Sequence, residues 1–575
     1  ILLAVVHAQL DGASVVDLKP EAAEAAAVSS LIEDGVLIEL ATERVKFKHD
    51  LFSDWAIAAY LSEDPERLMS LAGSGPPAFW LERGVELAFR HLAEQDDPEP
   101  WAGAVEMLQA SNANERWVGL ALLALVRSER ASKLLGRHET VLLADKGELA
   151  ERLARLVIGA HSIEVEVNVP SPAGNGTMST KSVAVPDPVF WTPLIIWSAL
   201  RFGDLPSKAL RGAVDLMHNW IAPFAATELK LTPVLLDRFA DLLVAHVEDR
   251  SLDYIPAGKP LPTIRYPAGR NTVDTARLTL AAFAEKNPSA AERYLNAIAA
   301  SDRAVDEFSE LLDFPFALPK AAPAAFATAL IDATRQEYDE CASDDSMRRM
   351  GLGLSRLEHP FTMGKCGVML FSDLLTADAD QGINLIRTLT SMTEDVVQTG
   401  GEFEFALLGQ TRLIKPSNSY GWPRGHGPSQ LVGKALSALE YWAHHEIEKG
   451  ADLETVVARI AGDGPISGAF LLVITDLALC HGTLGGPLLH DLLASPELLS
   501  VDFERHQYDY LETLRGGGLG RLRQGPASDR PIEQDLAARP SRHIGLHDVF
   551  IQIALKVPSD ELTALKARLD TAVQR

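Results

Sequence analysis

A cluster of histidines and acids offers the first pattern that could hold a metal ion. His444, His445, Glu446 and Glu448 lie close together in the sequence, near Glu440. A zinc site on a single helix needs ligands on one face, as positions i and i+4 provide. His444 and Glu448 have that spacing, but His445 points about 100° away. One histidine and one carboxylate are too few ligands, so we expect no metal site here.

Other candidates for catalysis are also incomplete. His543 and His547 have i,i+4 spacing, but Gly545 between them weakens the case for a helix. No Gly-x-Ser-x-Gly elbow presents a serine nucleophile. No Gly-x-x-x-x-Gly-Lys-Ser/Thr sequence occurs, so the chain has no P-loop to hold phosphates. We therefore expect no catalytic residue and no ATP hydrolysis by this chain alone.

The most informative chemistry lies near the N-terminus, where a histidine follows a lysine. The pattern predicts a helix over Glu21–Asp34, a hairpin of Val36–Leu40 and Arg44–Phe47, and a helix over His49–Leu61. A histidine at a strand-to-helix junction can present its imidazole beside the free backbone N–H groups of the helix, where a phosphate oxygen binds well. Lys48 adds a positive charge. The alternative is that His49 only caps the helix or packs at the junction.

This segment resembles the winged helix that closes the nucleotide-binding unit of STAND NTPases, the NACHT and NB-ARC group. Leu31–Leu37 is similar to the helix exit of that family, Phe47–Leu51 contains its His-Asp pair, and Asp54–Leu61 is similar to its aromatic and alanine helix. The match covers about 60 of the 575 residues. Lys48 departs from the pattern, because the family usually has methionine or another apolar residue there.

The resemblance implies a function for this module. In the family, the histidine contacts the β-phosphate of ADP and holds the resting state closed, and this role falls on His49, with Lys48 beside it. The catalytic core would then lie upstream of Ile1, and the whole protein would bind ATP or ADP with magnesium. The start at Ile1 instead of a methionine agrees with this expectation.

The remaining sequence predicts a mainly α fold. Apolar residues recur at helical spacing between Pro- and Gly-rich connections, without a fixed repeat, which favours an irregular α-solenoid of HEAT or armadillo type. We expect a winged-helix-like module over 1–65 and helical repeats over 66–253, with a hairpin insertion near 161–185. A Pro/Gly-rich linker over 254–271 precedes further repeats over 272–575. These contain a hairpin near 402–414 and a loop over 516–542.

One glycine-rich loop is a candidate partner-binding surface. It contains Tyr420, Trp422, Arg424 and His426. Aromatic and arginine side chains are typical of binding hot spots. They are equally typical of a loop that is pinned onto the end of a helix, so both interpretations stay open.

Composition excludes several classes of protein. The chain has 53 basic and 79 acidic residues, a net charge of −26, which argues against binding to nucleic acid or anionic membranes. No apolar stretch approaches the length of a transmembrane helix. The cysteines are too few and too scattered for a disulfide framework, so a cytoplasmic location is expected. They are Cys341, Cys366 and Cys480.

Together these features predict the regulatory and sensing part of a STAND-type NTPase. Its helical array would bind a protein ligand and so control nucleotide-dependent homo-oligomerisation with the upstream NTPase domain. Family association extends this to antiviral defence, with a phage-derived ligand. The alternative is a nucleotide-independent α-solenoid that serves as a protein-interaction scaffold.

Overall fold

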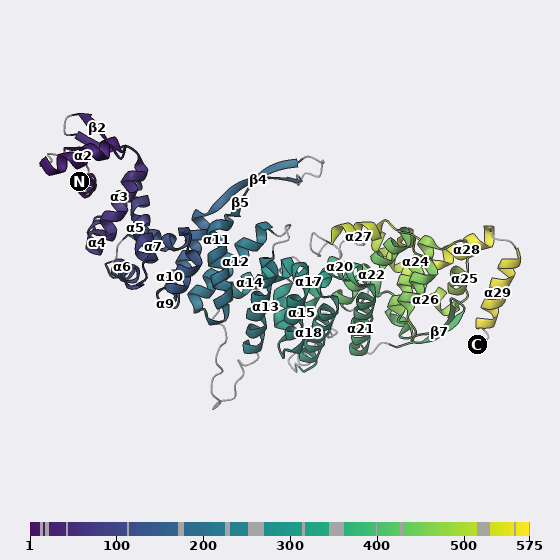
Figure 1. The fold of residues 1–575 in the computed structure, drawn as a ribbon. Helices are drawn as coiled ribbons and strands as arrows, with labels where there is room; N and C mark the ends of the chain where they lie inside the picture. The colour runs from purple at the N-terminus through teal and green to yellow at the C-terminus, as the bar shows by residue number, and fades with distance from the viewer. Residues whose placement is uncertain are drawn as a thin grey trace, which may run out of the picture. The chain divides into compact units, whose positions relative to one another are not determined.

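The structure is a computed structural model. It describes residues 1–11, 15–17, 22–41, 44–111, 114–170, 178–224, 230–250, 269–312, 317–343, 362–397, 400–425, 427, 429–514, 529–556 and 559–573. The fold is mainly α and solenoid-like, as the sequence predicts, with small antiparallel sheets (Figure 1). The chain divides into two compact units, one of Ile1–Leu242 and Thr263–Thr279, the other of Leu243–Pro262 and Leu280–Arg575.

The N-terminal elements of the first unit combine helices with a small sheet. Its strands have the order β1-β3-β2, and all pairs are antiparallel. Gly35 ends α2 because its φ of +72° lets the backbone turn, and the N–H of Val36 bonds back to Leu31 O. The elements are α1 (Leu2–Leu10), β1 (Val16–Asp17), α2 (Ala22–Glu33), β2 (Leu37–Ala41), β3 (Arg44–Phe47) and α3 (Asp50–Ser62).

This order contains the predicted helix, hairpin and helix, and adds the short strand β1, which the sequence did not indicate. Leu37 and Val45 fill the space beneath the sheet, and Ile57 and Leu61 of α3 are buried with them in the interior of the unit. The assignment of the module as a winged helix stays a prediction.

The other helices of the first unit stack on their neighbours. Helix α7 is buried almost all round, from Trp117 to Val126, because α5 and α10 both pack against it. The elements are α4 (Pro65–Gly73), η1 (Phe79–Leu81), α5 (Glu82–Glu94), α6 (Glu99–Ala110), α7 (Glu115–Arg127), α8 (Ala131–Arg137), α9 (Glu139–Leu143), α10 (Glu148–Ala160), β4 (Ser162–Pro170), β5 (Met178–Pro186), α11 (Pro188–Arg201), η2 (Phe202–Asp204) and α12 (Ser207–Phe224). Two further helices, α13 (Leu231–Arg250) and α14 (Arg270–Phe283), each begin in the first unit and end in the second.

The second unit is also built from packed helices. Helix α24 is buried from Gly468 to Ala478 and packs against α22, α23 and α25. The elements are η3 (Ala284–Lys286), α15 (Pro288–Ala300), α16 (Ala304–Leu311), α17 (Leu318–Ala321), α18 (Pro323–Ser343), η4 (Thr362–Lys365), α20 (Val368–Ala377), α21 (Ala379–Val397), β6 (Phe403–Leu407), β7 (Gln410–Ile414), η5 (Ser417–Ser419), η6 (Trp422–Arg424), α22 (Gln430–Glu448), α23 (Leu453–Ala461), α24 (Gly468–His481), α25 (Pro487–Leu493), α26 (Pro496–Leu514), α27 (Arg530–Ala537), η8 (Pro540–Arg542), α28 (Leu546–Lys556) and α29 (Ser559–Val573).

Both predicted hairpins are present. Strands β4 and β5 are paired along their length, with Ser162 opposite Pro186 at one end and Pro170 opposite Met178 at the other. Figure 1 shows them extending from the helices beside α11 and α12. Strands β6 and β7 pair around Leu408 and Gly409. The predicted loop over 516–542 requires correction, because residues 530–537 form α27, with Pro531 in the first turn where proline suits a helix.

The predicted linker over 254–271 lies outside the described residues up to 268, and residues 270–271 begin α14. Among the helices that the structure describes, none combines the length and apolar character needed to cross a membrane.

Candidate functional site

The predicted phosphate contact, His49, is the N-cap residue of α3. Its backbone is extended, with φ −132° and ψ 145°, and its carbonyl accepts a 3.0 Å hydrogen bond from the N–H of Phe52. The imidazole makes no capping hydrogen bond. Its ring lies 6.0 Å from the ring of Phe52, and the residue is exposed to solvent. The side chain is therefore accessible to a ligand at the start of a 13-residue helix.

The neighbouring lysine is held by its backbone and not by its side chain. The N–H of Lys48 donates to Val36 O at 3.0 Å. The ammonium lies over the end of α2, because Nζ is 3.1 Å from the position that a Cβ on Gly35 would occupy. Lys48 and His49 are both exposed, and the Lys48 ammonium with the first-turn amides of α3 gives this junction a positive potential. Asp50 in the same turn opposes part of it.

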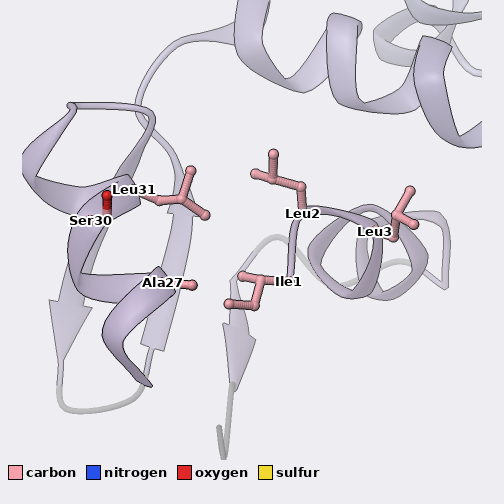
Figure 2. Close-up of a pocket in the computed structure, with 6 residues that line it drawn as sticks. All are labelled: Ile1, Leu2, Leu3, Ala27, Ser30 and Leu31. Carbon is pink, nitrogen blue, oxygen red and sulfur yellow. The ribbon is translucent and has the colours of Figure 1, made fainter. Parts of the chain in front are cut away.

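A groove in the N-terminal elements offers only apolar contact. It has a volume of about 470 Å³ and lies between α1 and α2. Figure 2 shows Leu31 and Ala27 of α2 facing Leu2 and Ile1, while Leu3 points away. Ser30 supplies the hydroxyl of an otherwise aliphatic lining, so the groove has no titratable side chain and suits apolar contact only.

The predicted partner-binding loop is packed inside the second unit. Tyr420 is 2% exposed and Trp422 is 5% exposed, and the side chain of Arg424 is 3% exposed. His426 lies outside the described residues. The burial corresponds to a loop pinned onto helix ends, since side chains so far from solvent cannot meet a partner in this conformation.

Arg424 is the centre of a buried charge network. Its Nη2 donates to Asp476 Oδ1 at 2.6 Å, and its Nη1 lies 3.5 Å from Glu440 Oε1. Both carboxylates are fully buried. Its Nε lies 3.5 Å from Asp509 Oδ2. Burial raises the pKa of Glu440 to about 7, although the charge of Arg424 acts against it, and burial raises the pKa of Asp476 as well.

A second arginine extends this network along α26. Arg505 donates to Asp502 at 2.7 Å and to Asp509 at 3.0 Å. The hydroxyl of Tyr420 donates to Asp502 at 3.0 Å. From the opposite side, Arg542 of η8 donates to Glu440 at 2.6 Å. The network thus ties α22, α24 and α26 to the loop.

One histidine of α22, His444, belongs to the same interior. His444 is fully buried, and its Nδ1 lies 2.8 Å from Nε2 of His481. Burial, and next the charge of Arg539, lower the pKa of His444 to about 4, so the ring is neutral at pH 7. Glu448 forms an ion pair with Arg539, and the side chain of Glu448 is 42% exposed. The structure therefore does not bring His444 and Glu448 together as ligands.

The sequence did not predict one side-chain cluster of the second unit. His547 was paired with His543 by spacing, but α28 begins only at Leu546, and His543 is exposed before it. His547 instead lies beside His506 of α26, with ring centroids 5.0 Å apart, and beside Asp548. No local pattern signals this, because His506 belongs to another helix.

Comparison with known proteins does not assign the chain. No protein-family model matches it, and no curated protein matches it.

Proposed function

We propose that this chain is the regulatory and sensing part of a STAND-type NTPase, in which His49 reports the nucleotide state. The observation that carries the proposal is the accessible imidazole of His49 at the start of α3, next to Lys48 and to first-turn amides without a side-chain cap. A terminal phosphate oxygen binds well to such a helix start. Phosphoryl chemistry would be performed by an NTPase domain outside these residues, with ATP or ADP and magnesium.

The test measures the ADP retained by the protein that includes its NTPase domain. Replacing His49 by alanine removes one hydrogen bond to a charged group, worth about 1.5–3 kcal/mol. We expect ADP affinity to fall at least tenfold, since about 1.4 kcal/mol corresponds to that factor. His7 of α1 is a matched control, because its side chain is 64% exposed and is paired with Asp11. Equal ADP content in wild type and His49→Ala would assign His49 to packing instead.

Ligand recognition would fall on exposed surfaces and not on the buried loop of Tyr420. The base of hairpin β4–β5 is one such surface, because Ile163 is 51% and Val165 is 43% exposed. A two-stranded hairpin is marginally stable alone, so an exposed apolar face on it suits a protein partner. Serine at both positions would then weaken activation by the ligand. The same change at Leu200 of α11, 74% exposed, would not.

A nucleotide-independent scaffold is the second candidate. It is favoured by the position of the Lys48 ammonium over Gly35, because a preformed phosphate cradle would direct that charge toward the helix start. Partner binding that is unchanged by ADP, by ATP and by His49→Ala would support the scaffold over the sensor.

A further inference from the structure

Two histidines and an aspartate converge between α26 and α28. Nε2 of His547 lies 3.4 Å from Asp548 Oδ1, and Nε2 of His506 lies 3.9 Å from Asp548 Oδ2. One ligand atom from each of the three lies within 4.8 Å of the others. The side chains are 20%, 31% and 36% exposed for His506, His547 and Asp548, so the cluster is half-buried with an open side.

The spacing of these atoms is close to that of a tetrahedral metal site. Bonds of about 2.0–2.1 Å at a tetrahedral angle separate two donor atoms by about 3.4 Å. Nε2 of His547 lies at this distance from Oδ1 of Asp548, and Nε2 of His506 lies half an ångström farther from the other carboxylate oxygen, Oδ2.

The surroundings hold Asp548 and His547 in place. The N–H of Gly545 donates to Asp548 Oδ2 at 2.9 Å, which fixes the carboxylate at the start of α28. Phe503 packs edge-on against His547, with centroids 5.3 Å apart.

We propose that His506, His547 and Asp548 bind a divalent transition-metal ion of the Zn²⁺ class, with solvent at the open position, and that the ion links α26 to α28. Two imidazoles and one carboxylate suit Zn²⁺ or Co²⁺ better than Mg²⁺ or Ca²⁺, which prefer oxygen ligands. The site does not depend on the proposed NTPase function.

The test uses the full chain after treatment with a chelator, titrated with Co²⁺ and followed by its visible absorption. The wild type should bind one equivalent, which Zn²⁺ displaces and Mg²⁺ does not, and Zn²⁺ should raise its melting temperature. His506→Ala and His547→Ala should each weaken binding by more than about 100-fold, because loss of a second-shell partner alone costs about 10–100-fold. His543→Ala, an exposed histidine nearby, should bind like the wild type.

If either histidine variant fails to fold, Asp548→Asn tests the site in its place. This variant loses the carboxylate charge but keeps an oxygen that can accept the hydrogen bond from the N–H of Gly545. It should weaken Co²⁺ binding while the circular dichroism stays unchanged. The proposal is overturned if the wild type binds no Co²⁺, if Mg²⁺ displaces it equally well, or if all folded variants bind like the wild type.

Discussion

The carboxylate of Asp529 caps the helix that begins at Val368. Its Oδ2 accepts a 2.9 Å hydrogen bond from the N–H of Val368, although the two residues are 161 positions apart in the chain. Its Oδ1 accepts from the N–H of Met369 at 3.1 Å. Gly367 makes the approach possible, because a Cβ there would lie 2.9 Å from Asp529 Oδ1. A fully buried side chain thus satisfies two amides that a helix start leaves free.

Removing this cap should destabilise α20. Replacing Asp529 by alanine leaves two N–H groups without an acceptor, and loss of an N-cap costs about 0.5–2 kcal/mol. Faster amide hydrogen exchange in α20 would report the effect locally, which is useful because one unfolding free energy does not describe a chain with two units. The Asp529→Asn variant keeps an oxygen acceptor, so the amide hydrogens of α20 should exchange more slowly in it than in Asp529→Ala. Unchanged exchange in both variants would contradict the capping role.

Arg424 should be among the most sensitive positions of the second unit. Its removal leaves Asp476 buried without its nearest cation and leaves Arg542 as the close cation of Glu440, and breaking a buried pair in this way costs about 3–5 kcal/mol. Urea denaturation of Arg424→Ala should show the transition of this unit at a clearly lower concentration.

Lys449→Ala provides the control for this loss of charge. Lys449 is the residue directly after α22. It pairs with Glu446 at 2.9 Å and its side chain is 67% exposed, so its loss should lower the free energy of unfolding by less than about 1 kcal/mol. Equal destabilisation by the two variants would show that burial of the Arg424 network does not matter.

The raised pKa of Glu440 predicts a dependence of stability on pH. Its folded pKa of about 7 lies above the ordinary value of 4.5, so between these values the folded state holds a proton that the unfolded state releases. This group therefore contributes stability that declines as the pH rises from 4.5 to about 7. Its titratable and charged neighbours include Arg424, Asp476, Arg542, Arg539 and Arg505.

Glu440→Gln removes that contribution. His444, with a pKa lowered to about 4, acts in the opposite direction, because the unfolded state binds its proton first as the pH falls below 6.5. The stability of Glu440→Gln minus that of the wild type should therefore increase from pH 5 to pH 7. Denaturation midpoints at several pH values would measure it, and a difference that does not vary with pH would reject the assignment.

Two glycines of the second unit should respond oppositely to alanine. At Gly468, the start of α24, a Cβ would lie 2.7 Å from Ser417 O and 2.9 Å from Tyr420 N. Backbone cannot yield easily, so Gly468→Ala should cost about 1–3 kcal/mol.

Gly433 lies within α22, and a Cβ there would be 3.8 Å from Trp422 O, an ordinary contact. Gly433→Ala should be neutral or stabilising by up to about 1 kcal/mol, because alanine favours the helix. Thermal melting of the two variants compares them directly, and a melting temperature unchanged by Gly468→Ala would show that the loop can move away from α24.

Local patterns in the sequence determined the elements of this protein. Alternation of apolar and polar residues over 161–185 predicted the hairpin β4–β5, and apolar periodicity predicted the helices, such as α7 and α10. The module around His49 was predicted as helix, hairpin and helix, and its accessible histidine was expected at the strand-to-helix junction. These features depend on residues that are close in the chain, where periodicity and turn chemistry act directly.

Only the tertiary structure decided what the side chains between the helices do. Arg424 in a glycine loop has the sequence of an exposed hot spot, but Asp476, 52 residues away, makes it the centre of a buried network. His547 meets His506 on another helix, and Asp529 caps α20 across 161 residues. Such pairs depend on which helix faces stack and on how far each helix is rotated about its axis. The spacing of residues along one helix cannot specify that relation between two helices.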